Sequence, residues 1–138
     1  MKLRNSSNII LRSLAATLFF ASVALSITLS PLAYADKADV VDATISSLGD
    51  GRYRIDATVA HADTGWDHYA DAWEVTTPEG EILGVRVLAH PHVNEQPFTR
   101  SLTLEIPAGV TMVILQANDS VHGGGGARFE LQVPDAAS

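Results

Sequence analysis

Residues 52–59 alternate between apolar and polar side chains, and this pattern restricts the fold of the chain more than any other feature. Tyr, Ile, Ala and Val occupy the odd positions, while Arg, Asp and Thr occupy the even ones. A period of two places one face of an extended strand in a core and the other in water. The segment therefore predicts a half-buried β-strand.

Six further segments have strand character, and turn signals rich in Gly, Pro and Asp separate most of them. No segment of this part of the sequence has a convincing 3.6-residue helical period. Seven short strands at this spacing predict an all-β, two-sheet β-sandwich. The segment at 110–119 is apolar on both faces, which predicts a central strand. The predicted strands are residues 38–48, 52–61, 70–77, 82–90, 98–106, 110–119 and 127–133.

The third predicted strand carries Trp73, in phase with Val75. A large aromatic in that strand resembles the core aromatic of immunoglobulin and fibronectin type III domains. The resemblance is one of architecture and spans residues 36–138. It implies a seven-stranded immunoglobulin-like or fibronectin type III-like sandwich. The chain departs from antibody domains because it has no cysteine pair and no tyrosine in the sixth strand.

The N-terminal 35 residues have the pattern of a secretory signal peptide. Three basic residues precede an uncharged, mostly apolar run at 13–30, and Pro31 and an Ala-Tyr-Ala cleavage pattern at 33–35 follow. We expect cleavage after Ala35, which leaves a single domain over residues 36–138. The cleaved protein is expected to be periplasmic or secreted and not to associate with a membrane. The alternative is an uncleaved membrane anchor, since the apolar run approaches spanning length.

The composition of residues 36–138 excludes several classes of function. This part holds sixteen acidic and six basic residues, a net charge of −10, which disfavours nucleic-acid and anionic lipid partners. The chain has no cysteine. A cysteine nucleophile, a blue-copper centre and a thiolate zinc site are therefore excluded, and any site must use imidazoles, carboxylates, amides and hydroxyls.

All five histidines fall in or beside three of the predicted connections. These connections follow the second, fourth and sixth strands, and in an antiparallel sandwich they lie at the same end. His90 and His92 flank Pro91, and at this spacing in an extended segment both side chains point to one side. The predicted end-face cluster consists of His61, His68, His90, His92 and His122.

Neutral imidazole is a preferred ligand of copper(II) and zinc, so the five histidines are candidate ligands of a divalent transition metal. Nearby acids, Asp63, Asp67 and Asp119, are candidates to complete the ligand shell or to orient ring nitrogens. After cleavage Met112 is the only methionine, which argues against a copper(I) site. This reading predicts an exported protein that handles, buffers or delivers the metal.

Structural roles are open for several of these residues. If His61, which is in phase with the core face, has only a structural role, it is expected to form a hydrogen bond with the backbone. If His68 is not a ligand, it is expected to be solvated. Arg100 interrupts an apolar face and is expected to pair with an acid on the neighbouring strand. Residues 123–126, four glycines, read as a flexible hairpin loop.

A second function uses the same loops without metal, as a module that binds a periplasmic or extracellular protein. Trp66 and Tyr69 are then contact residues together with His68. Otherwise the two aromatics are expected to be partly buried loop anchors.

A third function is enzymatic. The His-x-His of His90 and His92 resembles the copper site of copper–zinc superoxide dismutase, and that resemblance implies a metal-dependent enzyme. The chain lacks that family's cysteine pair and long zinc-binding loop, and it has no serine-hydrolase or His-Glu-x-x-His motif. We therefore predict a binding protein rather than an enzyme.

Overall fold

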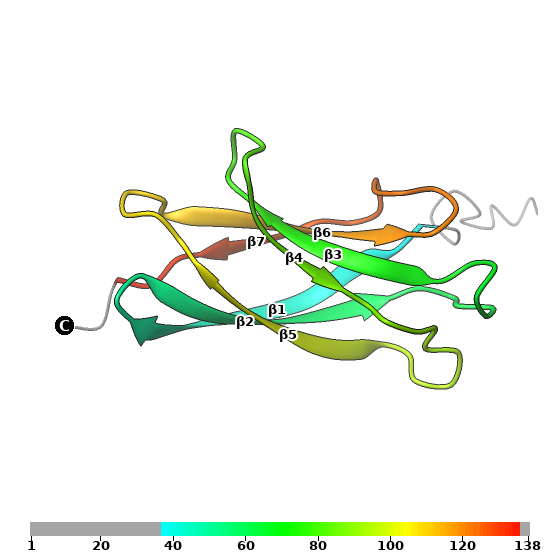
Figure 1. The fold of residues 1–138 in the computed structure, drawn as a ribbon. Helices are drawn as coiled ribbons and strands as arrows, with labels where there is room; N and C mark the ends of the chain where they lie inside the picture. The colour runs from blue at the N-terminus through cyan, green and yellow to red at the C-terminus, as the bar shows by residue number, and fades with distance from the viewer. Residues whose placement is uncertain (1–36, 136–138) are drawn as a thin grey trace, which may run out of the picture.

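The computed structural model describes residues 37–135, which form two antiparallel sheets packed face to face (Figure 1). Seven strands and no helix are found in this part of the chain. The all-β, two-sheet prediction is confirmed. The predicted signal peptide and its cleavage site lie outside the described residues.

One sheet has three strands and the other has four. The three-stranded sheet has the order β1-β2-β5, and its strands are β1 (Asp39–Gly49), β2 (Arg52–Ala60) and β5 (Phe98–Glu105). The four-stranded sheet has the order β4-β3-β6-β7, and its strands are β3 (Ala70–Thr76), β4 (Ile82–Val87), β6 (Met112–Asp119) and β7 (Phe129–Gln132).

The core lies between the sheets and is built by the alternation seen in the sequence. In β2 every second residue is buried, from Tyr53 to Val59, and Trp73 of β3 is fully buried. Strand β6 pairs with β3 on one side and β7 on the other, which confirms that it is central. Its inward side chains include Val113 and Leu115, and the same inward row ends in Asp119.

Three connections lie at one end of the sandwich, at the right of Figure 1: β2–β3 (residues 61–69), β4–β5 (88–97) and β6–β7 (120–128). We call this end the loop end. All five histidines belong to these three connections. The prediction that they share one end is therefore correct, because strand direction alternates along the chain.

Two of the four consecutive glycines, Gly124 and Gly126, lie close to other parts of the chain, whereas Gly123 has open space around it. A Cβ atom on Gly126 would run into the backbone carbonyl of Ala38, and one on Gly124 would run into the side-chain amide of Gln116. At these two positions the absence of a Cβ atom allows the backbone to approach another backbone or a strand face closely. Gly124 and Gly126 thus let the β6–β7 connection lie against strand β6 and the residues before β1.

The prediction of the ion-pair partner of Arg100 is wrong. Its guanidinium pairs with Glu95 in the β4–β5 connection, at 2.9 Å, rather than with an acid on the neighbouring strand. Strand β5 is an edge strand, and its one neighbour, β2, places Ala57 opposite Arg100. With no acid opposite, the side chain reaches back over Phe98, 5.5 Å from the ring centroid.

Candidate metal centre

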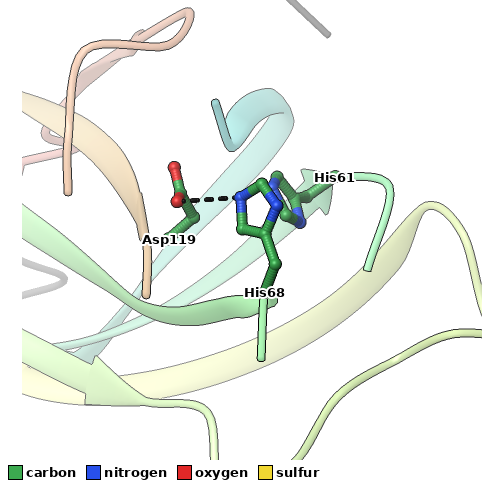
Figure 2. A group of neighbouring side chains, drawn as sticks. All are labelled: His61, His68 and Asp119. Atoms are coloured by element: carbon green, nitrogen blue, oxygen red, sulfur yellow. Dashed lines mark hydrogen bonds and ion pairs between the residues drawn. The ribbon is translucent and has the colours of Figure 1, made fainter. Parts of the chain in front are cut away.

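Two histidines and one aspartate meet at the loop end in an arrangement suited to a metal ion (Figure 2). One potential ligand atom from each of His61, His68 and Asp119 lies within 4.8 Å of the other two. His61 follows the last residue of β2, and Asp119 ends β6. The group therefore joins the ends of one interior strand from each sheet, and His68 is supplied by the β2–β3 connection between the sheets.

Asp119 is a buried carboxylate with an uneven set of partners. Its Oδ1 accepts hydrogen bonds from the backbone N–H of Val121 (3.0 Å) and His122 (2.7 Å), an Asx-type turn that this residue favours. The same oxygen lies 3.1 Å from His68 Nε2 and 3.1 Å from His122 Nδ1. Its other oxygen, Oδ2, is buried and has no hydrogen-bond partner among residues 37–135.

The hydrogen bonds to Asp119 keep it ionised. Burial favours the neutral acid, but the backbone N–H groups of His122 and Val121 and the His122 ring outweigh it, so the pKa of Asp119 lies below its ordinary value. A charged carboxylate with a buried, unpartnered oxygen is costly unless a cation or donor meets it. This oxygen is the feature of the site that a bound metal ion would explain.

His61 is held from behind by a second carboxylate. Its Nδ1 lies 2.6 Å from Asp63 Oδ1, and both side chains are almost fully buried. The partner of Nδ1 is thus the side chain of Asp63, two residues along the chain. A carboxylate bonded to one ring nitrogen is the usual support of a metal-binding histidine.

His122 lies beside the group of three. Its ring centroid is 5.0 Å from that of His68, and the His68 ring is 4.7 Å from that of His61. The tight turn that carries His122 is closed by paired backbone hydrogen bonds between Asp119 and Gly123, each 3.0 Å. The side chain of His122 is 34 % exposed, so it is the histidine of this set that solvent reaches most easily.

The donor set fits zinc, copper(II) or iron(II), all of which accept imidazole and carboxylate. In a tetrahedral zinc site the ligand atoms lie roughly 3.4 Å apart, as the ~2.1 Å metal–ligand bonds require. The three side chains would therefore move together slightly on binding. When His68 Nε2–H donates to Asp119, the lone pair of the neutral ring is on Nδ1, so binding through Nε2 would require this hydrogen bond to open.

His90 and His92 are not members of this group, although the sequence predicts them as ligands. Their ring centroids are 4.6 Å apart. The ring of His92 stacks on Phe98 at 3.8 Å with an interplanar angle of 10°. The side chain of His92 is 3 % exposed, so it is buried although its segment is a connection. The resemblance to copper–zinc superoxide dismutase was based on His90 and His92, and neither residue belongs to this group.

The predicted accessory residues have different positions. Asp119 is itself a member of the group, which is the first of the two roles expected for the nearby acids. Asp67 is exposed and makes no hydrogen bond or ion pair within residues 37–135. Trp66 is 67 % exposed and meets Tyr69 edge-on at 5.6 Å, so it is not the partly buried anchor that the sequence suggested.

Sequence reasoning missed Gln96. Its Oε1 accepts a hydrogen bond from the backbone N–H of His61 (3.0 Å), and its Nε2 donates to the carbonyl of His92 (3.0 Å). This side chain therefore ties the β2–β3 and β4–β5 connections together. No local pattern marks such a residue, because its two partners are distant in the sequence or depend on the fold of the loop.

Fold and site together define a small antiparallel β-sandwich with a histidine–carboxylate group, suited to a metal ion, at one end. The chain is 41 % identical over 102 residues to a protein named "Putative lipoprotein" from Halomicrobium mukohataei. The match covers 74 % of this chain and 50 % of that protein, so the chain spans about half the length of this curated relative.

Among solved structures, the fold is similar to a superoxide reductase (neelaredoxin) from Ignicoccus hospitalis, with a TM-score of 0.47 and 16 % sequence identity. That match covers 76 % of this chain and 87 % of the other, and at this level it carries no argument about function. No protein-family model matches the chain.

Proposed function

We propose that this protein is an exported binding protein for a divalent transition metal, copper(II) or zinc. The ion is bound by His61, His68 and Asp119, and His122 is available as a fourth ligand. The observation that carries the proposal is the convergence of the first three residues, one potential ligand atom of each within 4.8 Å of the other two, at a carboxylate whose second oxygen is buried and unpartnered within residues 37–135.

The chemistry of the donors supports copper(II) or zinc over copper(I). Copper(I) prefers thiolate and thioether sulfur. The chain has no cysteine, and Met112 lies at the start of β6, seven residues from Asp119 at its end. Imidazole and carboxylate are instead the ligands of zinc and copper(II).

Export is supported by the N-terminal pattern and by the name of the relative, a lipoprotein. Within residues 37–135 no helix is long and apolar enough to cross a membrane. The order of the strands in the two sheets also supports an immunoglobulin-like or fibronectin type III-like fold, in which loops at one end are the usual binding surface.

The test is a thermal-shift titration of residues 36–138 with copper(II) and with zinc at pH 7.5. A metal that binds only the folded protein stabilises it by about 2.7 kcal/mol at a concentration of 100 times Kd. We expect wild type to shift and His68→Ala to lose most of the shift. His90→Ala is the matched control, since it removes an exposed imidazole from the same end, and it should keep the shift.

Two results contradict the proposal. The first is the absence of a shift with either metal in wild type. The second is a shift that survives in His68→Ala but is lost in His90→Ala, which would move the site to the β4–β5 connection.

A metal-free interaction module is the second candidate. Trp66 and Val121 are 67 % and 57 % exposed, and both belong to connections of the loop end. Exposed apolar residues in such loops suit contact with a periplasmic or extracellular protein. This second function is favoured if no metal stabilises the wild type. If the first proposal holds instead, Trp66→Ala should leave the metal-induced thermal shift unchanged.

A further inference from the structure

Asp63 is a buried carboxylate that does not belong to the group of three. Its Oδ1 accepts hydrogen bonds from His61 Nδ1 (2.6 Å) and the backbone N–H of Ala70 (2.9 Å). Its Oδ2 accepts one from the backbone N–H of His92 (2.7 Å). Three donors from three points of the chain thus converge on one side chain, which fixes its orientation.

These contacts decide which nitrogen of His61 carries the proton. An ionised carboxylate can only accept hydrogen bonds, so Nδ1 must donate to Asp63. In the neutral ring the lone pair then belongs to Nε2. The hydrogen bond to a carboxylate also raises the basicity of that nitrogen toward a metal.

The same carboxylate attaches His61 to the β4–β5 connection. Asp63 holds the backbone N–H of His92, while Gln96 bridges the backbone N–H of His61 and the carbonyl of His92. The His92 ring is in turn stacked on Phe98 of β5. The His-Pro-His segment therefore supports the site from behind through its backbone and takes no part in the group of potential ligands.

We propose that Asp63 is the positioning residue of the metal site: it holds His61 in the Nδ1–H tautomer, with Nε2 as the metal-binding atom. This inference rests on the proposed function and extends it to a residue that does not touch the ion. Loss of a carboxylate in this position typically weakens metal binding by about 10–100-fold.

The first measurement needs no variant. In metal-free, ¹⁵N-labelled wild type at pH 7.5, long-range ¹H–¹⁵N correlation spectra report which imidazole nitrogen is protonated. We expect His61 to be protonated at Nδ1. Protonation at Nε2 would overturn the inference, and this result does not depend on how any variant folds.

The second measurement compares the zinc and copper(II) affinities of Asp63→Ala and Asp67→Ala by calorimetric titration. Asp67 is the matched control because it lies in the same connection and removes the same charge from an exposed position. We expect about a 10–100-fold loss for Asp63→Ala and a change within about fivefold for Asp67→Ala. Circular dichroism in the presence of chelator checks that both variants are folded.

The outcomes separate this inference from the proposed function. If wild type binds neither metal, both fail. If wild type binds metal and folded Asp63→Ala binds it as tightly, Asp63 is not a positioning residue, while the metal site itself stands. An equal loss in the two variants would reduce the effect to charge alone and would also overturn the inference.

Discussion

His92 provides a sharp test of the structure, because the sequence and the fold assign it different environments. Its side chain is 3 % exposed, its ring lies parallel to Phe98, and both ring nitrogens are buried without a hydrogen-bond partner within residues 37–135. We therefore predict that His92→Phe is more stable than both wild type and His92→Ala.

Two opposing effects set the magnitudes. His92→Phe keeps the stacked ring and removes the unpaired nitrogens, each of which costs about 1–3 kcal/mol when buried, against an overpacking cost of about 1 kcal/mol or more for the larger ring. His92→Ala also removes those nitrogens but leaves a cavity and loses the aromatic pair. The two variants should differ by about 3–5 kcal/mol, as for a buried Phe→Ala change.

The assay is urea denaturation at pH 7.5 with chelator present, so that metal binding does not contribute. His90→Ala is the control: this residue is exposed, and its change should stay within about 0.5 kcal/mol. If His92→Ala were as stable as His92→Phe, the burial and stacking of the ring would be refuted. If His92→Phe were clearly less stable than wild type, the ring nitrogens would have partners after all.

Wild type and His92→Phe should also differ in how their free energy of unfolding depends on pH, and the sign of this difference is defined. Burial, together with Arg100 and His90, lowers the pKa of His92 in the folded protein. In the unfolded chain an imidazole takes up its proton near pH 6.5. Below about that pH the unfolded state binds more protons, so the free energy of unfolding of wild type falls until the lower, folded pKa is passed. His92→Phe should show a smaller decrease between about pH 7 and 5, and equal slopes would contradict this assignment.

Further predictions concern the metal, the glycines and the surface charges. Metal affinity should fall steeply between about pH 7 and 5, because protons compete for imidazole lone pairs. An affinity that stays constant over this pH range in calorimetric titrations would argue against histidine ligands. Gly126→Ala should lower the melting temperature more than Gly124→Ala, because its Cβ meets the backbone of Ala38, whereas the side-chain amide of Gln116 can move. Glu95→Gln should leave the midpoint of urea denaturation almost unchanged, since its ion pair with Arg100 is half-exposed, and a clear decrease of the midpoint would contradict this interpretation.

The sequence alone determined the strands and the end at which the histidines lie. Both follow from local rules: a period of two assigns each side chain of β2 or β6 to a face, and turns reverse the chain at regular intervals. The predicted boundaries differ most at the end of β4, where the predicted strand reached His90 but the observed strand ends at Val87. Beyond that point pairing gives way to a single bond from Leu88 to the carbonyl of Asp71.

Only the tertiary structure decided which histidines meet. From the sequence, His90 and His92 were candidate ligands together with the other three histidines. The fold instead groups His61, His68 and Asp119 and stacks His92 on Phe98. Side-chain direction in a connection depends on what the neighbouring connections offer as hydrogen-bond partners and packing surfaces. Those partners, such as Asp63 for the backbone of His92, 29 residues away, are brought close only when the two sheets pack. Periodicity carries no information about such contacts, because it describes neighbours along one strand and not the loops that meet across the end of a sandwich.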